Sequence, residues 1–200
     1  MNRPDLSDKL IHLTKGNDDR DAAHTLIKIL RDRTLLGGDG YIKGGYKCVC
    51  FCETPISHLA YVLANREAAE FKYRAFGLMF SKEFIYARGG RPVIYGDAQQ
   101  FDDLPEAYKF RHVLFDPNRV DGGGKPAPVD LTWEREWRLK TDSLAFTPKD
   151  VTIICPKRGF VNAAYKLLPK VEGEGEMPWH FTVLEDIGVE IPLEVTPEKK

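Results

Sequence analysis

The residues best suited to chemistry form one short charged segment, Trp133-Glu134-Arg135-Glu136-Trp137-Arg138. Alternate residues of a strand share a face, so an extended 133–140 presents Glu134, Glu136 and Arg138 together, with the tryptophans on the opposite face. Two carboxylates about 7 Å apart suit a cleft in which one of them hydrogen-bonds a sugar hydroxyl or stabilises a developing cation. Arg138 would favour the ionised form of the neighbouring glutamate. From the pattern alone, a solvent-exposed face with cross-strand salt bridges is the simpler interpretation.

A second candidate group is His12 and Thr14, which alternate on an apolar segment and would point the same way. A histidine and a hydroxyl together can donate to and accept from a ribose or a carboxamide. The alternative is a core histidine whose hydrogen bonds are satisfied within the fold.

The third candidate is the segment Tyr73-Arg74-Ala75-Phe76-Gly77. A tyrosine, an arginine and a glycine that lead into an apolar strand can build a shelf for an aromatic ring, because glycine allows close approach of the backbone. The alternative is a core strand whose first residues are solvated.

Three of the four cysteines alternate as Cys48, Cys50 and Cys52, so a strand would place their thiols on one face. Zinc sites usually combine C-x₂₋₄-C spacing with a second pair of ligands, and no such pair follows. Small core residues in a reducing compartment are the favoured interpretation, and no metal is expected.

Hydrophobic spacing predicts the elements that position these residues. Two amphipathic helices are expected, one over 23–30 that ends at the glycines of 37–40, and one that Thr54 caps and Pro55 begins. A loop is expected at 116–130, directly before the charged segment, with a frayed tail from about residue 196. Further helices are expected over 106–114 and 159–168, and strands over 9–14, 47–53, 76–80, 92–95, 133–140, 151–155 and within 181–191.

These elements do not alternate strictly between strand and helix. They therefore predict an α+β fold in which residues 1–200 form a single domain, with a twisted mixed or antiparallel sheet flanked by helices. The chain has 29 basic and 30 acidic side chains, so its net charge attracts neither nucleic acid nor an anionic membrane. No apolar stretch is long enough to span a bilayer and no secretory signal is recognised, so a cytoplasmic protein is expected. Motifs of P-loop NTPases, dinucleotide-binding enzymes, zinc proteases and serine hydrolases are absent from the sequence.

The order of these motifs resembles a bacterial family. Leu10-Ile-His-Leu-Thr14, Cys50-Phe-Cys-Glu-Thr-Pro55, the Tyr73 segment and Glu134-Arg-Glu-Trp-Arg138 are similar to those of the abortive-infection AbiGi-type phage-resistance proteins. More remotely, the beginning resembles DarT-type ADP-ribosyltransferases. The resemblance covers about residues 10–139. It departs from the DarT type after the second strand, where Glu53-Thr-Pro55 stands in place of an arginine.

The resemblance implies an ADP-ribosyltransferase-like fold and an enzyme of the glycosyltransferase class that uses NAD as substrate. Glu136 would be the catalytic glutamate and Glu134 its neighbour. The NAD contacts would come from His12, Thr14, Tyr73, Arg74 and Phe76. The acceptor would be nucleic acid or protein, in phage defence or a toxin–antitoxin system with a cognate antitoxin or partner protein. Two alternatives stay open: a non-catalytic binding or regulatory module on the same fold, and a metal-dependent nuclease that uses the two carboxylates with Asp130.

Overall fold

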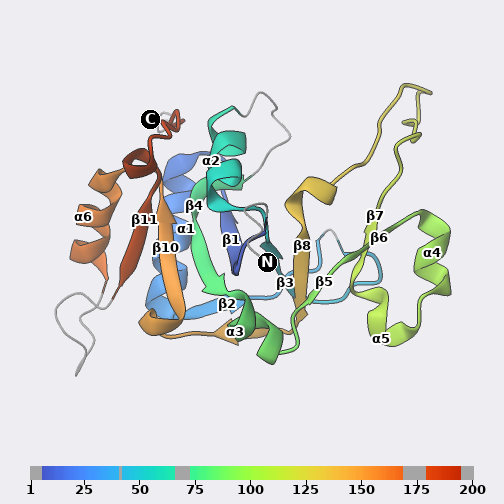
Figure 1. Ribbon diagram of the computed structural model, residues 1–200, viewed down its shortest axis with the longest axis horizontal. Helices are drawn as coiled ribbons and strands as arrows, with labels where there is room; N and C mark the ends of the chain where they lie inside the picture. Colours follow the sequence, from blue (N-terminus) through green and yellow to red (C-terminus); the bar gives the residue numbers. More distant parts are fainter. Residues whose placement is uncertain (1–5, 41, 66–72, 169–178, 195–200) are drawn as a thin grey trace, which may run out of the picture.

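A seven-stranded sheet runs through the centre of the molecule (Figure 1). This computed structural model describes residues 6–40, 42–65, 73–168 and 179–194. The strand order is β11-β10-β4-β1-β3-β8-β5, and every neighbouring pair is antiparallel except β10 and β11. The mixed sheet with flanking helices confirms the predicted α+β class. The bounds of its strands are β1 Lys9–Lys15, β3 Cys48–Cys52, β4 Tyr73–Ser81, β5 Arg91–Pro92, β8 Glu136–Lys140, β10 Val151–Cys155 and β11 His180–Val183.

Helix α1 (Asp19–Asp32) covers one face of the sheet. Its apolar residues recur at helical spacing, and Leu26 and Leu30 are fully buried in the larger hydrophobic cluster. The side chain of Asp18 accepts a hydrogen bond from the Asp21 N–H and so caps the helix. The helix ends at Arg33, in the left-handed conformation, and not at the glycines of 37–40 as the sequence predicted. Strand β2 (Thr34–Leu36), which pairs with β9 (Ser143–Ala145), lies between Arg33 and those glycines.

Helix α2 (Ile56–Ala64) covers the opposite face, where Leu59 and Leu63 pack with Ile11 of β1 in a second cluster. The predicted threonine cap is wrong. Pro55 occupies the cap position, and the hydroxyl of Thr54 donates to the backbone carbonyl of Trp133. That hydroxyl therefore ties α2 to the charged segment.

Strands β1 and β4 approach each other closely at Gly77. A Cβ atom at this position would lie 2.4 Å from the carbonyl oxygen of His12, which is closer than real Cβ contacts allow. The glycine therefore lets the central pair of strands close beside His12.

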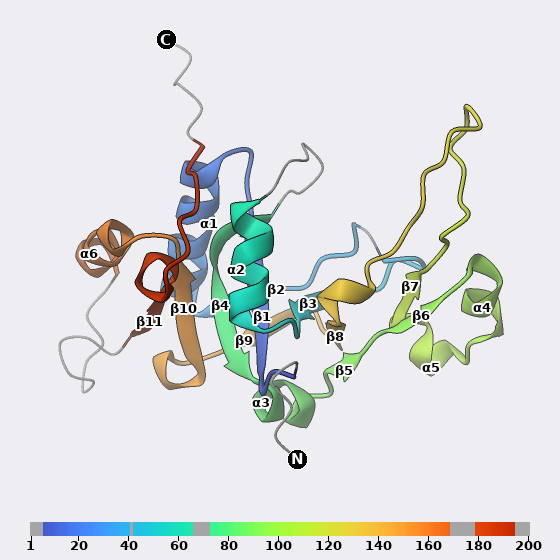
Figure 2. The same cartoon turned by 45° about the horizontal axis from the view of Figure 1, so that its top comes forward.

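Beyond β5 the chain leaves the main sheet. Strands β6 (Ile94–Gly96) and β7 (His112–Leu114) pair in parallel beside helices α4 (Ala98–Asp103) and α5 (Glu106–Lys109). The predicted single strand over 92–95 is thus divided between two sheets, and the predicted helix over 106–114 ends at Lys109. The predicted loop over 116–130 is confirmed, and it forms an arm that projects from the body (Figures 1 and 2).

The remaining elements mostly follow the expected pattern. Helix α6 (Arg158–Leu167) covers one end of the sheet and corresponds to the helix predicted over 159–168. The short helix α3 (Lys82–Ala87) was not predicted. The late strand prediction holds only for β11, because the 3₁₀ turn η3 (Leu184–Ile187) follows it. The frayed tail expected from about residue 196 lies outside the described residues. Among the helices that the structure describes, none combines the length and apolar composition that crossing a bilayer requires.

Candidate functional site

The two glutamates do not lie on one continuous strand. Residues Thr132–Glu134 form the 3₁₀ turn η1, Arg135 takes a left-handed conformation with φ 47°, and β8 begins only at Glu136. The left-handed conformation costs a residue with a side chain about 1 kcal/mol. The predicted strand over 133–140 is therefore wrong in its first half, because a turn positions Glu134.

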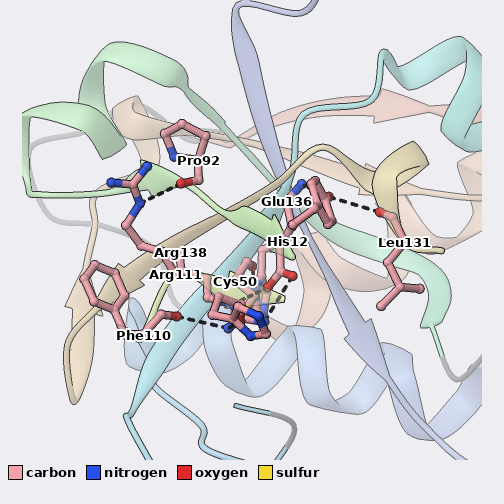
Figure 3. Close-up of polar contacts among 10 residues, drawn as sticks. His12, Cys50, Pro92, Phe110, Arg111, Leu131, Glu136 and Arg138 are labelled. Atoms are coloured by element: carbon pink, nitrogen blue, oxygen red, sulfur yellow. Dashed lines mark hydrogen bonds and ion pairs between the residues drawn. The ribbon is translucent and has the colours of Figure 1, made fainter. Parts of the chain in front are cut away.

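Four hydrogen bonds from three residues, Tyr95, Glu53 and Thr54, hold this turn. The hydroxyl of Tyr95 accepts from the N–H of Glu136 at 3.1 Å and donates to the carbonyl of Leu131 at 3.0 Å (Figure 3). The N–H of Glu53 donates to the carbonyl of Glu134 at 3.1 Å. The Thr54 hydroxyl adds the bond to Trp133 described above. Tyr95 of β6, with Glu53 and Thr54 between β3 and α2, thus fixes the position of Glu134 relative to Glu136.

Glu136 is part of a buried ion pair. Its two carboxylate oxygens accept from Nε and Nη2 of Arg138 at 2.8 and 3.2 Å. The Nη1 of Arg138 donates to the carbonyls of Phe110 at 3.0 Å and His112 at 2.9 Å (Figure 3). Both side chains are almost inaccessible to water, so the bidentate geometry and the carbonyl acceptors compensate for their desolvation.

Glu134 lies in a different electrostatic environment. Its side chain is half-buried, and within the part of the chain that the structure describes it forms no ion pair. Burial, and then the negative charge of Glu136, raise the pKa of the Glu134 carboxyl to about 7, while the charges of Lys15 and Arg138 act against this. A carboxyl group of this kind exchanges its proton near neutral pH.

Tyr73 lies on the same side of the sheet as the two glutamates. Burial raises the pKa of its phenol, and the charges of Glu134 and Glu136 add to that effect. The Nζ of Lys15 lies over the Tyr73 ring, 4.9 Å from its centroid. The Tyr73 phenol therefore lies within electrostatic range of Glu134 and Glu136.

His12 points to the other face of the sheet. Pairing joins Ile11 to Cys52 and Cys52 to Glu136, so these three residues share one face and His12 faces away from them. The His12 ring packs edge-on against Phe51 with centroids 6.0 Å apart, and its Nδ1 lies 2.8 Å from the carbonyl oxygen of Cys50 (Figure 3). Burial lowers the pKa of His12.

The other residues for which NAD contacts were predicted have partners inside the fold. The hydroxyl of Thr14 faces the carbonyls of Ala22 and Phe76. Phe76 is buried in the core. The guanidinium of Arg74 donates to the carbonyls of Gly16 and Asn17 and to the carboxylate of Glu194 at 2.6 Å. These three side chains therefore do not join Glu134, Glu136 and Tyr73.

The three alternating cysteines share one face of β3, as the sequence predicted, because their partners Lys140, Arg138 and Glu136 alternate in the same way along β8. All are free thiols. Burial raises the pKa of Cys48 and of Cys52 to about 11, so both are uncharged at neutral pH. Among the described residues, no cluster of three metal-binding side chains is found.

Sequence reasoning missed Tyr95 and Lys15. Tyr95 approaches Glu136 only because the chain runs along β8 after β5, where the Val93 N–H donates to the Glu136 carbonyl at 2.9 Å. No spacing pattern signals such a contact. Lys15 reaches the site because it follows Ile11 and Leu13 on the same face of β1 and is paired with Tyr73 of β4.

Comparison with protein-family models, curated proteins and solved structures finds no significant match to this chain.

Proposed function

We propose that the protein is an ADP-ribosyltransferase-like enzyme that cleaves NAD and transfers its ADP-ribosyl group to nucleic acid or protein. The observation that carries this proposal is the pair of unlike carboxyl groups. Glu136 forms a buried ion pair with Arg138, whereas Glu134 has a pKa of about 7. Neighbouring carboxyl groups in such different states are typical of sites that divide acid–base and electrostatic roles between them.

Each glutamate has a role in the proposed reaction. The bond between ribose C1′ and the nicotinamide nitrogen breaks, and nicotinamide leaves with the bonding electrons. The ribose then carries oxocarbenium character, which the negative charge of Glu136 stabilises. An acceptor N–H or O–H attacks C1′ and passes its proton to Glu134, whose pKa of about 7 suits a general base at neutral pH.

NAD as substrate, and a role in phage defence or a toxin–antitoxin system with a cognate antitoxin, rest on the resemblance of the motifs. Tyr73 is the predicted NAD contact that lies beside Glu134, and we assign to it the stacking of the nicotinamide ring. Four free thiols suit a reducing compartment, which supports a cytoplasmic place of action.

NAD binding tests the proposal at its first step. Saturation-transfer NMR with NAD should give signals for the nicotinamide protons with the wild-type protein, and weaker signals with Tyr73→Ala. Tyr61→Ala is the matched control, because Tyr61 is exposed on α2. Absence of NAD signals with the wild-type protein, in the presence of nucleic acid and protein acceptors, contradicts the proposal.

The second candidate function is a non-catalytic module on the same fold. The ion pair of Glu136 with Arg138 favours it, because both carboxylate oxygens are already occupied by the guanidinium. This candidate predicts that NAD or a nucleotide binds while no nicotinamide is released. Release of nicotinamide by the wild-type protein eliminates it.

A further inference from the structure

The segment over 188–194, which follows η3, passes the start of helix α1 (Figure 2). Ile191 anchors it, because that side chain is 2% exposed and packs in the second hydrophobic cluster with Leu59 and Leu63 of α2. Glu194 and Asp19 then bind each other through two hydrogen bonds. The Asp19 N–H donates to the Glu194 carbonyl at 2.9 Å, and the Glu194 N–H donates to the Asp19 carboxylate at 2.6 Å. Glu194 therefore has a fixed place beside the first turn of α1.

The carboxylate of Glu194 forms an ion pair with a buried arginine. Nη1 of Arg74 lies 2.6 Å from Oε2 of Glu194, and the Arg74 side chain is almost inaccessible to water. The same guanidinium donates through Nε to the carbonyl of Gly16 at 3.4 Å and through Nη2 to that of Asn17 at 3.0 Å. Among the residues that the structure describes, Glu194 is the sole carboxylate paired with this guanidinium. Arg74 thus connects the start of β4, the loop that follows β1, and the 188–194 segment.

This cluster lies directly behind two residues of the candidate site. Tyr73 precedes Arg74 on β4, and neighbouring residues of a strand point to opposite faces of the sheet. Lys15 precedes Gly16 at the end of β1 and is the register partner of Tyr73. The ammonium group of Lys15 lies 4.9 Å from the centroid of the Tyr73 ring. The backbone that Arg74 holds is therefore the backbone that carries Lys15 and Tyr73.

The loop after β1 is packed closely against the first turn of α1. A Cβ atom at Gly16 would lie 2.5 Å from the backbone nitrogen of Ala22 and 2.8 Å from the carbonyl oxygen of Asp18, closer than real Cβ contacts allow. The same turn of α1 binds Glu194 through Asp19. Because close-packed interiors transmit strain, a change at Glu194 is passed through this turn and through Arg74 to the loop.

We propose that Glu194 is a positioning residue of the candidate site, which acts through Arg74 to hold Lys15 and Tyr73 in place relative to Glu134. Its role is indirect, because Arg74 and the loop after β1 lie between it and Lys15. As a statement about the arrangement of these side chains, the inference is independent of the proposed function. As a statement about turnover, it rests on that function.

A double-mutant cycle that measures the protonation of Glu134 tests the inference without NAD. Burial raises the pKa of Glu134, whereas the charge of Lys15 acts to lower it. Lys15→Met should therefore raise the pKa of Glu134 further, as measured by carbon-13 NMR titration. In the Glu194→Ala background, the same substitution should raise that pKa by less than about half as much, because Lys15 is no longer held in place. Any direct effect of the Glu194 charge on Glu134 cancels in the cycle.

Glu190→Ala is the matched control, because Glu190 is an exposed glutamate of the same segment. In this background, Lys15→Met should raise the pKa of Glu134 by the same amount as in the wild-type protein. If Glu194→Ala does not fold, as judged by circular dichroism, Glu194→Gln replaces it. Glutamine keeps the backbone bonds to Asp19 and the side-chain size, and it removes the charge that pairs with Arg74. The reduced response to Lys15→Met is expected in this background too.

Two results overturn the inference. The first is an equal response to Lys15→Met in the Glu194→Ala and wild-type backgrounds, which would leave Glu194 a purely structural residue even if stability falls. The second is an equally reduced response in the Glu190→Ala background. Under the proposed function, Glu194→Ala should also slow nicotinamide release about tenfold or more. A wild-type protein that releases no nicotinamide would refute that function and leave the result of the cycle standing, so the two failures are distinguishable.

Discussion

At the scale of single residues, Glu134 and Glu136 differ through their neighbours. Arg138 donates two hydrogen bonds to the carboxylate of Glu136. The carboxyl group of Glu134 instead has its pKa raised by burial and by the negative charge of Glu136. Two identical side chains two positions apart can thereby take different roles in one reaction.

The raised pKa of Glu134 makes stability depend on pH. The pKa is about 7 in the folded protein against an ordinary value of 4.5, so between these values the folded protein keeps a proton that the unfolded chain has released. The free energy of unfolding therefore falls as pH rises from about 4.5 to 7, by about 3 kcal/mol in total. Glu134→Gln should remove this loss.

Urea unfolding at pH 4, 6 and 8 checks this prediction. The Glu134→Gln protein should match the wild-type protein at pH 4 and exceed it by up to about 3 kcal/mol at pH 8. Glu83→Gln, an exposed change on α3, is the control and should show no such trend. A stability difference for Glu134→Gln that is the same at all three pH values would refute the assignment.

Glu136→Gln should lower the free energy of unfolding, which is opposite to the effect expected for Glu134→Gln. Removing the carboxylate leaves the Arg138 guanidinium buried without its counter-charge, which should cost about 3 kcal/mol in the free energy of unfolding. Loss of the like charge should also lower the pKa of Glu134, measurable by carbon-13 NMR titration.

An exposed ion pair provides the comparison for this change. Asp186→Asn breaks the exposed pair with Arg158 and should cost less than about 1 kcal/mol. If the two substitutions cost the same, the Glu136–Arg138 pair is not the buried structural pair described above.

At the scale of elements, the turn before β8 gives the site its geometry, and the phenol of Tyr95 bridges both ends of that turn. Tyr95→Phe removes both hydrogen bonds and should lower the free energy of unfolding by about 2 kcal/mol. The loosened turn should admit water to Glu134 and move its pKa toward 4.5. Urea unfolding and NMR titration measure the two effects.

Tyr61→Phe is the control for this substitution, because Tyr61 is 68% exposed on α2. It should change neither quantity. A Tyr95→Phe protein that loses stability while the pKa of Glu134 stays near 7 would assign Tyr95 a purely structural role.

The spacing of apolar residues correctly predicted those helices and strands whose own sequence has a regular apolar pattern. The spacing of Leu26 and Leu30 identified α1, and the apolar run Val151–Cys155 identified β10 with its observed bounds. The turn at Arg135 could not be predicted this way. Its left-handed conformation is maintained by tertiary bonds from Tyr95, Glu53 and Thr54, which come from distant parts of the chain.

In the candidate site, too, local spacing predicted some features and missed those that depend on contacts between distant segments. Period-two alternation correctly placed Glu136 and Arg138 on one face of β8. The resemblance of the motifs, and not this alternation, led to the expectation that His12 would contact the same ligand as Glu136. That expectation could not be checked from the sequence, because the relative face of two strands depends on their register, which here places His12 with Phe51.

At the scale of the whole molecule, the arm over 116–130 projects from the body that holds the candidate site (Figure 2). The Ala127 N–H donates to the Arg119 carbonyl at 2.8 Å, so the two sides of the arm are adjacent there. Replacing residues 120–126 with Asn-Gly should change the free energy of unfolding by less than about 0.5 kcal/mol, because the removed side chains are largely exposed.

Urea unfolding measures this effect, and NAD binding by the shortened protein should equal that of the wild-type protein. A loss of stability well above 1 kcal/mol would mean that the arm packs on the body.

The central claim is that the paired glutamates act on NAD, and release of nicotinamide from NAD tests it most directly. With nucleic acid or protein acceptors present, we predict that the wild-type protein releases nicotinamide at a rate that rises as pH increases through about 7. Folded Glu134→Gln should be slower by about a hundredfold or more. Absence of nicotinamide release by the wild-type protein, or an unchanged rate in Glu134→Gln, would contradict the claim.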